Sequence, residues 1–112
     1  MGKIRVDILY PIGYNMSMEI RKTEEFSNWI DGLKNLQARA RIQARIERLA
    51  MGNPGDVKAI GNGLSEMRVD FGPGYRVYYT TKGKVLIILL VGGDKKTQGK
   101  DIIKAKSLAA HL

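Results

Sequence analysis

Two arginines, Arg68 and Arg76, flank the turn sequence Gly72-Pro73-Gly74. Each stands at a polar position of a stretch in which polar and apolar residues alternate. This alternation is typical of strands with one apolar face, so we expect a hairpin with both arginines on its polar face. A guanidinium group holds phosphate oxygens in a bidentate fork and stays charged at neutral pH. The sequence therefore predicts a phosphate-binding patch on this hairpin.

The expected register of the hairpin keeps its apolar residues opposite one another. A three-residue loop pairs Phe71 with Tyr75 and achieves this, whereas a two-residue loop would mix the polar and apolar faces. Arg76 then faces Asp70 and has two open interpretations, a phosphate ligand or one half of an ion pair with Asp70 that stabilises the hairpin. The predicted patch contains the polar residues of both strands, which are Arg68, Asp70, Arg76 and Tyr78.

Cleavage of an RNA chain is one reaction that such a patch can support. The 2′-hydroxyl attacks the adjacent phosphate, and the reaction needs a base, positive groups for the developing charge and an acid for the leaving oxygen. The sole histidine, His111, is next to the C-terminus, and the chain has no cysteine and no carboxylate cluster with metal-ligand spacing. A nuclease built on this sequence would use Arg, Lys, Tyr or Asp, and we expect no metal ion and no cofactor.

The charge of the chain points to a polyanionic partner. Nineteen Lys and Arg against eleven Asp and Glu give a formal net charge of +8. A positive field attracts nucleic acid, although an acidic protein can exploit the same charge. The absence of a long apolar run and of cysteine agrees with a cytoplasmic protein that has no contact with membranes.

Further basic residues form two groups that can contact RNA. Arg41, Arg45 and Arg48 recur at helical spacing and form a basic stripe, which can bind RNA, contact another protein or simply be solvated. Lys58 lies in a glycine-rich segment, and Lys95 and Lys96 follow a long apolar run. Polar loops next to buried strands often carry binding sites, although these lysines can equally be solvated.

The periodicities predict an α+β fold in the order β-α-α-β-β-β-α. We expect an N-terminal α-hairpin packed on a small, mostly antiparallel sheet, followed by a C-terminal helix. The apolar run 85–91 should be an interior strand because both of its faces are apolar. The predicted elements are a strand at 19–22, helices from Thr23 to about 33 and from 36 to 51, a loop at 52–63, strands at 64–71, 75–80 and 85–91, and a helix at 100–110.

Residues 1–17 differ from the rest of the chain and form a leader. Met16 and Met18 are both plausible alternative starts, so the leader is either an extension foreign to the domain or an edge strand. We assign the domain to residues 18–112 and no function to the leader.

This order of elements resembles the RelE/ParE toxin superfamily, in particular its phage-derived, Gp49-like and HigB-like addiction module killer proteins. The resemblance covers roughly residues 18–110, and the order and spacing of its pieces carry it together. These pieces are residues 19–23 (EIRKT) with Phe26 and Trp29, 37–42 (QARARI), 52–58 (GNPGDVK), 67–69 (MRV), 72–79 (GPGYRVYY), 92–98 (GGDKKTQ) and 101–102 (DI).

The resemblance implies a toxin that cuts messenger RNA in the ribosome, without a metal ion, until an antitoxin masks it. Arg76 matches the arginine of the Gly-Tyr-Arg strand, which in the family contacts the scissile phosphate. Arg68 stands where related toxins carry a lysine, and Lys95 falls near another basic residue of the family. Glu66 reverses the charge of a second family lysine, and Tyr78 is our candidate for the acid or a stacking surface.

The resemblance also implies a cognate antitoxin, often one with a helix-turn-helix domain. Two other functions remain open from the sequence, namely a ParE-like inhibitor of DNA gyrase without nuclease activity and a plain nucleic-acid-binding module. Arrest of growth on expression would exclude the plain binding module, and DNA breaks would indicate gyrase.

Overall fold

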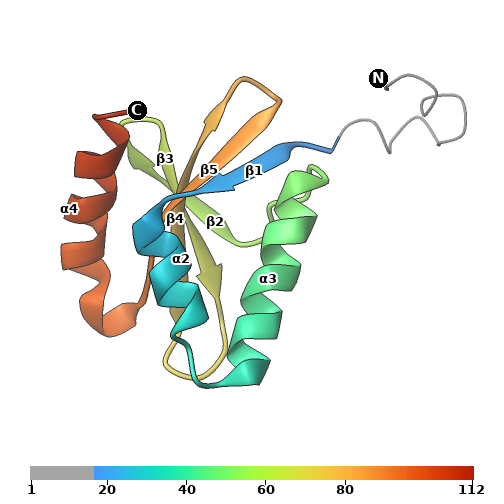
Figure 1. Cartoon of the computed structure of the whole chain (residues 1–112), viewed down its shortest axis with the longest axis vertical. Coiled ribbons are helices and arrows are strands. Elements are labelled where there is room, and N and C mark those ends of the chain that lie inside the picture. The colour runs from blue at the N-terminus through green and yellow to red at the C-terminus, as the bar shows by residue number, and fades with distance from the viewer. Residues whose placement is uncertain (1–16) are drawn as a thin grey trace, which may run out of the picture.

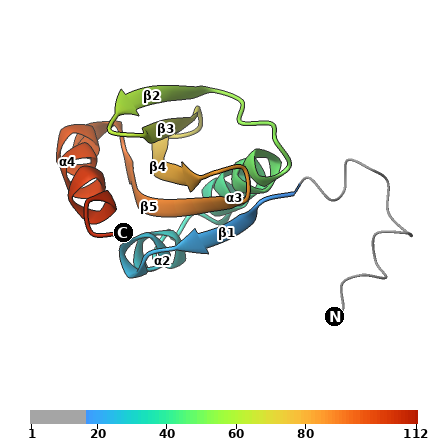
Figure 2. The same ribbon diagram turned by 90° about the horizontal axis from the view of Figure 1, so that it is seen from above.

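A computed structural model describes residues 17–112, which fold into a five-stranded sheet with helices on both faces (Figures 1 and 2). This confirms the predicted α+β class, with an α-hairpin, a mostly antiparallel sheet and a C-terminal helix. The leader lies outside the described residues, apart from Ser17. The elements are β1 (Glu19–Lys22), α2 (Glu24–Asp31), α3 (Leu36–Ala50), β2 (Val57–Gly61), β3 (Leu64–Val69), β4 (Tyr75–Lys82), β5 (Leu86–Asp94), the short 3-10 helix η2 (Lys95–Thr97) and α4 (Gln98–Ala109).

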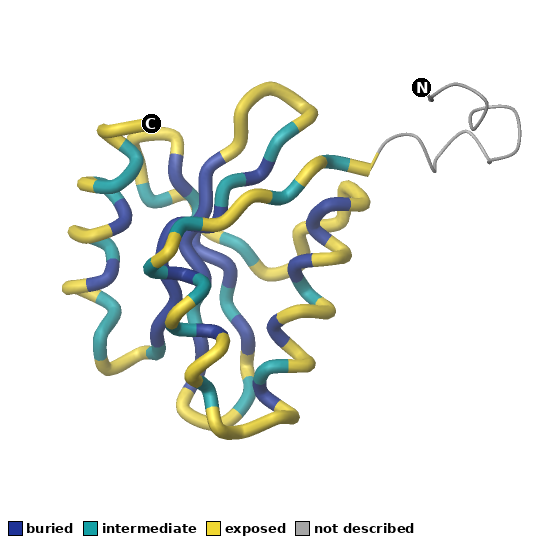
Figure 3. The backbone as a smooth tube through the Cα atoms, in the orientation of Figure 1, coloured by how far each residue is buried: buried dark blue, intermediate teal, exposed yellow. Residues whose placement is uncertain are grey.

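The sheet separates two apolar cores. Figure 3 marks the buried residues of the strands and helices in dark blue. The alternating side chains of β3 and β4, such as Met67 and Val77, pack against α2 and α3 in the larger core. The other face of the sheet packs against α4 through Tyr78 and Leu90. Because α4 covers only part of its face, polar side chains of β3 and β4 can reach solvent beside it.

The strand order is β1-β5-β4-β3-β2, with β1 parallel to β5 and the other neighbours antiparallel. The apolar strand β5 is interior, as its two apolar faces predict. Thr23 joins this strand to α2, because its hydroxyl caps the helix at Phe26 N and donates to the Leu90 carbonyl at 2.7 Å.

The prediction that residues 52–63 form a loop is wrong, since they contain the edge strand β2. This strand has the sequence VKAIG and is exposed along most of its length, so no apolar alternation marks it. Its backbone pairs with β3, and a partner strand can supply the hydrogen bonds that a weak local propensity does not.

The predicted three-residue loop of the β3–β4 hairpin is also wrong. Val69 pairs with Tyr75, so residues 70–74 form a five-residue connection. The shift places Arg68 directly opposite Arg76, and Glu66 opposite Tyr78. A shift by two positions keeps every side chain on its predicted face, which is why the apolar pattern alone did not reveal it.

No helix within residues 17–112 is long and apolar enough to cross a membrane.

Candidate phosphate-binding site

The cross-strand pair Arg68 and Arg76 lies at a cavity of about 260 Å³ on the face of the sheet that also carries α4. Lys95, at the end of β5, lines the same cavity, so the fold brings together three of the four residues predicted to be catalytic. We call this cavity the arginine pocket. It is lined by Asp56, Arg68, Asp70, Gly72, Pro73, Gly74, Arg76 and Lys95.

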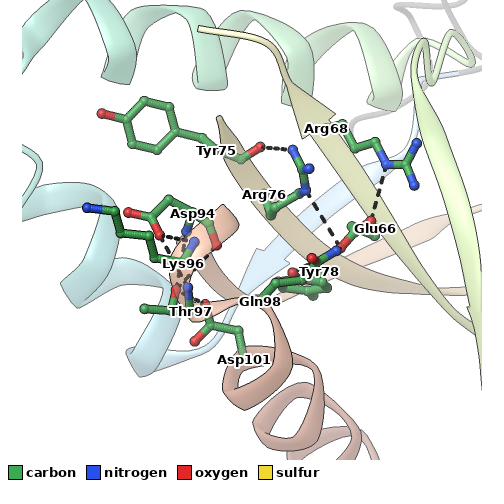
Figure 4. Close-up of polar contacts among 10 residues, drawn as sticks. All are labelled: Glu66, Arg68, Tyr75, Arg76, Tyr78, Asp94, Lys96, Thr97, Gln98 and Asp101. Carbon is green, nitrogen blue, oxygen red and sulfur yellow. Dashed lines mark hydrogen bonds and ion pairs between the residues drawn. The ribbon is translucent and has the colours of Figure 1, made fainter. Parts of the chain in front are cut away.

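Glu66 is the buried anchor of this site (Figure 4). Only 1% of its side chain is exposed. Its carboxylate accepts hydrogen bonds from Arg68 Nε at 3.2 Å, Tyr78 Oη at 3.0 Å and Gln98 Nε2 at 2.6 Å. Arg76 Nε lies 3.8 Å from Glu66 Oε2, so one carboxylate holds both guanidinium groups at the edge of the pocket.

The environment of Glu66 favours its ionised form. Burial is the largest single influence and raises the pKa of its carboxyl group. The hydrogen bonds from Gln98, Tyr78 and Arg68 and the charge of Arg76 lower this pKa, and their combined effect is larger than that of burial. The net pKa is below the ordinary value. Glu66 is therefore an anion at neutral pH and orients the two arginines.

Arg76 has hydrogen-bonding capacity to offer a ligand. Its side chain is 12% exposed and lines the pocket, whereas its Nε is buried beside Glu66 and makes no hydrogen bond within residues 17–112. One terminal nitrogen donates to the Tyr75 carbonyl at 3.4 Å, a long hydrogen bond. Its ion-pair partner is Glu66, which corrects the sequence-based pairing with Asp70.

Tyr78 does not reach the pocket surface that the sequence suggested for it. Its ring is fully buried in the smaller core, and its hydroxyl donates to Glu66. Burial, followed by the hydrogen bond to Glu66, raises the pKa of the hydroxyl above its ordinary value. Because a sealed ring can neither stack on a base nor meet a leaving group, we assign Tyr78 to positioning Glu66.

The loop after β5 holds Lys95 in the pocket through backbone contacts. Lys95 N–H donates to the Gly74 carbonyl at 3.0 Å, and the Asp94 carboxylate caps η2 at the amides of Lys96 and Thr97. Gly74 has a φ of +81°, and a Cβ there would lie 2.9 Å from the side chain of Lys95. The glycine therefore leaves room for the lysine stem. Lys96 is exposed beside it.

The basic stripe of α3 divides into one structural residue and two exposed residues. Arg45 donates to the carbonyls of Arg68 at 2.6 Å, Pro54 at 3.1 Å and Asp56 at 3.3 Å. It thereby holds the segment before β2 against the end of β3. Arg41 and Arg48 are exposed, and together with Arg45 they line a second cavity of about 240 Å³ that shares Asp70 with the arginine pocket.

Replacing Arg45 with alanine is expected to lower the free energy of unfolding by about 2 kcal/mol, because three carbonyls lose a charged donor. Arg48→Ala on the same helix is the matched control and should change it by less than about 0.5 kcal/mol. Equal effects in denaturant titrations would show that the Arg45 contacts contribute nothing to stability.

Two members of the site, Glu66 and Gln98, were not predicted from the sequence, and the predicted residue Lys58 lies outside the pocket. Glu66 reverses the charge of the family lysine expected there, and the sequence predicts no role for Gln98. Their role depends on a contact between β3 and the start of α4, which are far apart in the sequence.

Lys58 lies opposite Glu66 in the β2–β3 pairing, where it is exposed outside the arginine pocket. No group of three or more His, Asp or Glu side chains suited to a metal ion occurs within residues 17–112.

Comparison with known proteins assigns this sequence to a family. A model of the phage-derived Gp49-like proteins (DUF891) matches residues 28–110. The chain belongs to the Gp49-like family. It is also 53% identical over 97 residues to an uncharacterized protein of Haemophilus influenzae strain Rd, covering 87% of this chain and 98% of that protein.

Gp49-like proteins are toxins of the RelE/HigB type, as the sequence resemblance indicated. Membership of this family indicates the toxin half of a toxin–antitoxin pair and implies an antitoxin partner. Among solved structures, the conserved hypothetical protein HP0894 of Helicobacter pylori matches 70% of this chain and 96% of its own, at 16% identity and a TM-score of 0.47.

Proposed function

We propose that this Gp49-like protein cuts messenger RNA in the ribosome, with the scissile phosphate held in the arginine pocket. The observation that carries the proposal is the cross-strand pair of Arg76 and Arg68 on one buried carboxylate. Two guanidinium groups at the edge of one cavity suit the two free oxygens of a phosphodiester. Their fixed orientation means that little reorganisation is needed as negative charge develops in the transition state.

The remaining groups of the arginine pocket suit the proton transfers. A carboxylate, Asp56 or Asp70, accepts the proton of the 2′-hydroxyl, whose oxygen then forms a bond to phosphorus. The bond from phosphorus to the 5′-oxygen breaks, and the Lys95 ammonium donates the proton that this oxygen needs. The products are a 2′,3′-cyclic phosphate and a free 5′-hydroxyl.

A basic surface around the pocket can guide RNA to it. Arg41 and Arg48 lie beside the cavity that shares Asp70 with the arginine pocket, whereas Lys58 and Lys96 are exposed on β2 and η2. Such contacts give affinity that falls as salt rises and that is insensitive to base sequence. We assign these residues to ribosomal or messenger phosphates.

The proposed function is tested by adding purified protein to a reconstituted translation reaction and mapping the ends of the message. We expect new 5′-hydroxyl ends within translated codons and none when ribosomes are omitted. Intact message with undiminished protein synthesis would contradict the proposal.

Replacing Gly74 with alanine is expected to reduce cleavage, because the new methyl group displaces Lys95 from the pocket. Gly83→Ala is the matched control, since Gly83 also has a positive φ, of +61°, but no atom of residues 17–112 lies within 4 Å of its Cβ position. Both variants should lose about 1 kcal/mol of stability from the backbone strain. Equal cleavage by both in the translation assay would remove Lys95 from the mechanism.

Inhibition of DNA gyrase is a second candidate function, favoured by one observation. The lining of the arginine pocket contains no histidine, and the tyrosine predicted as its acid is buried. A protein that inhibits gyrase by binding, and breaks no bond itself, needs neither group. Loss of gyrase supercoiling activity, with message left intact, would select this function. Under both functions we propose a helix-turn-helix antitoxin as the partner.

A further inference from the structure

A separate cavity of about 350 Å³ lies beside the last residues of β5, and we call it the Trp29 pocket. The strand β1 pairs with β5 only as far as Leu89, so no strand of residues 17–112 lies beside the edge of β5 beyond that point. Pro73 lines both this cavity and the arginine pocket, which makes them neighbours. The lining residues used below are Trp29, Tyr75, Gly92, Lys100 and Asp101.

One wall of the Trp29 pocket is aromatic. Trp29 and Tyr75 meet edge to face, with ring centroids 6.3 Å apart. The indole packs so closely on Gly92 that a Cβ there would fall within the ring. A flat, half-buried aromatic surface of this kind suits the face of another planar ring.

The floor of the pocket is the backbone edge of β5 that no strand of residues 17–112 covers. Lys95 N–H donates to the Gly74 carbonyl, and backbone bonds to an antiparallel neighbour alternate along a strand. Gly92 and Asp94 therefore direct their N–H and C=O groups away from β4. Asp94 shows this directly, because the Thr97 hydroxyl contacts its N–H at 3.3 Å and its carbonyl at 3.4 Å. By the same alternation Gly92, which is buried under Trp29, directs one donor and one acceptor away from β4 at the lining of the pocket.

The opposite wall comes from α4 and is charged. The Asp101 carboxylate is nearly buried and accepts a hydrogen bond from the Thr97 hydroxyl at 2.5 Å. Lys100 is exposed at the rim. A carboxylate can accept from an exocyclic amino group, and an ammonium group can bind a carbonyl or phosphate oxygen.

We propose that the Trp29 pocket binds a purine base of the RNA whose phosphate lies in the arginine pocket. The inference rests on the proposed function and adds to it a site of base selection. The hydrogen-bonding edge of a purine presents a donor and an acceptor side by side, which complements the N–H and C=O of Gly92. The larger ring system of a purine also covers more of the aromatic wall than a pyrimidine does.

The test is a titration of ¹⁵N-labelled protein with AMP, GMP, CMP, UMP and ribose 5-phosphate at constant ionic strength. We expect AMP or GMP to shift the Gly92 amide and Trp29 indole signals and to bind about tenfold more tightly than ribose 5-phosphate. Ribose 5-phosphate should shift only signals around Gly74 and Arg76. Equal affinities, or Gly92 and Trp29 signals that do not move, would overturn the inference, and CMP or UMP binding as tightly as purines would overturn the purine assignment.

Two substitutions and a control sharpen this test. Trp29→Leu removes the aromatic wall and should abolish the purine preference, while Trp29→Phe should retain part of it. Lys100→Ala, on an exposed position where unfolding is not a concern, should weaken purine binding and leave ribose 5-phosphate binding unchanged. Lys104→Ala, exposed on the same helix outside the pocket, should change neither. A Lys100→Ala variant with unchanged purine binding counts against the site.

The outcome is separable from that of the proposed nuclease activity. Message cleavage that is indifferent to base identity, without purine binding, would overturn the Trp29 pocket and leave the nuclease. Purine binding with intact message in the translation assay would overturn the nuclease and leave the base site.

Discussion

Replacing Arg76 with alanine is expected to reduce message cleavage by about 100- to 1000-fold, the loss usual when a preorganised donor to a transition-state oxyanion is removed. The guanidinium lines the arginine pocket, with its buried Nε directed at Glu66. One of its terminal nitrogens makes only the long hydrogen bond to the Tyr75 carbonyl, so the terminal nitrogens can bind a phosphate. The measurement is the rate of message cleavage in the reconstituted translation reaction.

The fold should survive the Arg76→Ala change. Glu66 keeps three hydrogen-bond donors, from Arg68, Tyr78 and Gln98, when Arg76 is removed. The matched control is Arg21→Ala, which removes an arginine from an exposed ion pair with Glu19 and should leave cleavage and unfolding unchanged. Full cleavage by a folded Arg76→Ala protein would contradict the assignment of this residue.

Replacing Glu66 with alanine is expected to lower the free energy of unfolding by about 3–5 kcal/mol, the cost typical of removing one partner from a buried ion pair. The Tyr78 hydroxyl and the Gln98 amide lose their acceptor, and two guanidinium groups lose their counter-charge. Cleavage should fall as well, because nothing then orients Arg68 and Arg76. Glu19→Ala, in an exposed pair, should change stability by less than about 1 kcal/mol.

The contribution of Glu66 should depend on pH in a defined direction. Its pKa is lowered in the folded state, so its ionisation stabilises the fold above the ordinary value of 4.5. That stabilisation is lost as the pH falls below 4.5 through the folded-state pKa. The stability difference between the parent protein and Glu66→Gln should therefore shrink in acid, as urea titrations at pH 7 and at pH 3 can measure. An undiminished difference would show that the carboxylate is not an anion in the fold.

The α+β class and the polar face of the hairpin could be predicted from the sequence because they follow from local periodicity. Apolar residues recur at helical spacing from Phe26 to Leu33, and they alternate along β3 and β4. This alternation places Arg68 and Arg76 on one face for any register shifted by two. The net charge of +8 and the turn at Gly72-Pro73-Gly74 can likewise be read from the sequence without information on distant contacts.

The pairing of strands and the burial of polar groups could not be predicted in the same way. The sequence VKAIG has no apolar alternation that would mark it as a strand. It forms one because its partner β3 supplies the backbone hydrogen bonds, and this pairing cannot be read from the segment itself. Tyr78 alternates with apolar residues as a surface residue would, but α4 packs over that face and buries it. The exposure of a strand residue depends on which helix covers the sheet, and that is not encoded locally.

The residue pattern along the chain is enough to predict two arginines on one face of the sheet in a basic α+β protein that resembles toxins. That Glu66 anchors both arginines, and that Gln98 and Tyr78 in turn hold Glu66, follows only from contacts made on folding. Local periodicity sets which way a side chain points from its own strand, whereas a buried carboxylate is stable only among donors from several elements, and only folding brings those together.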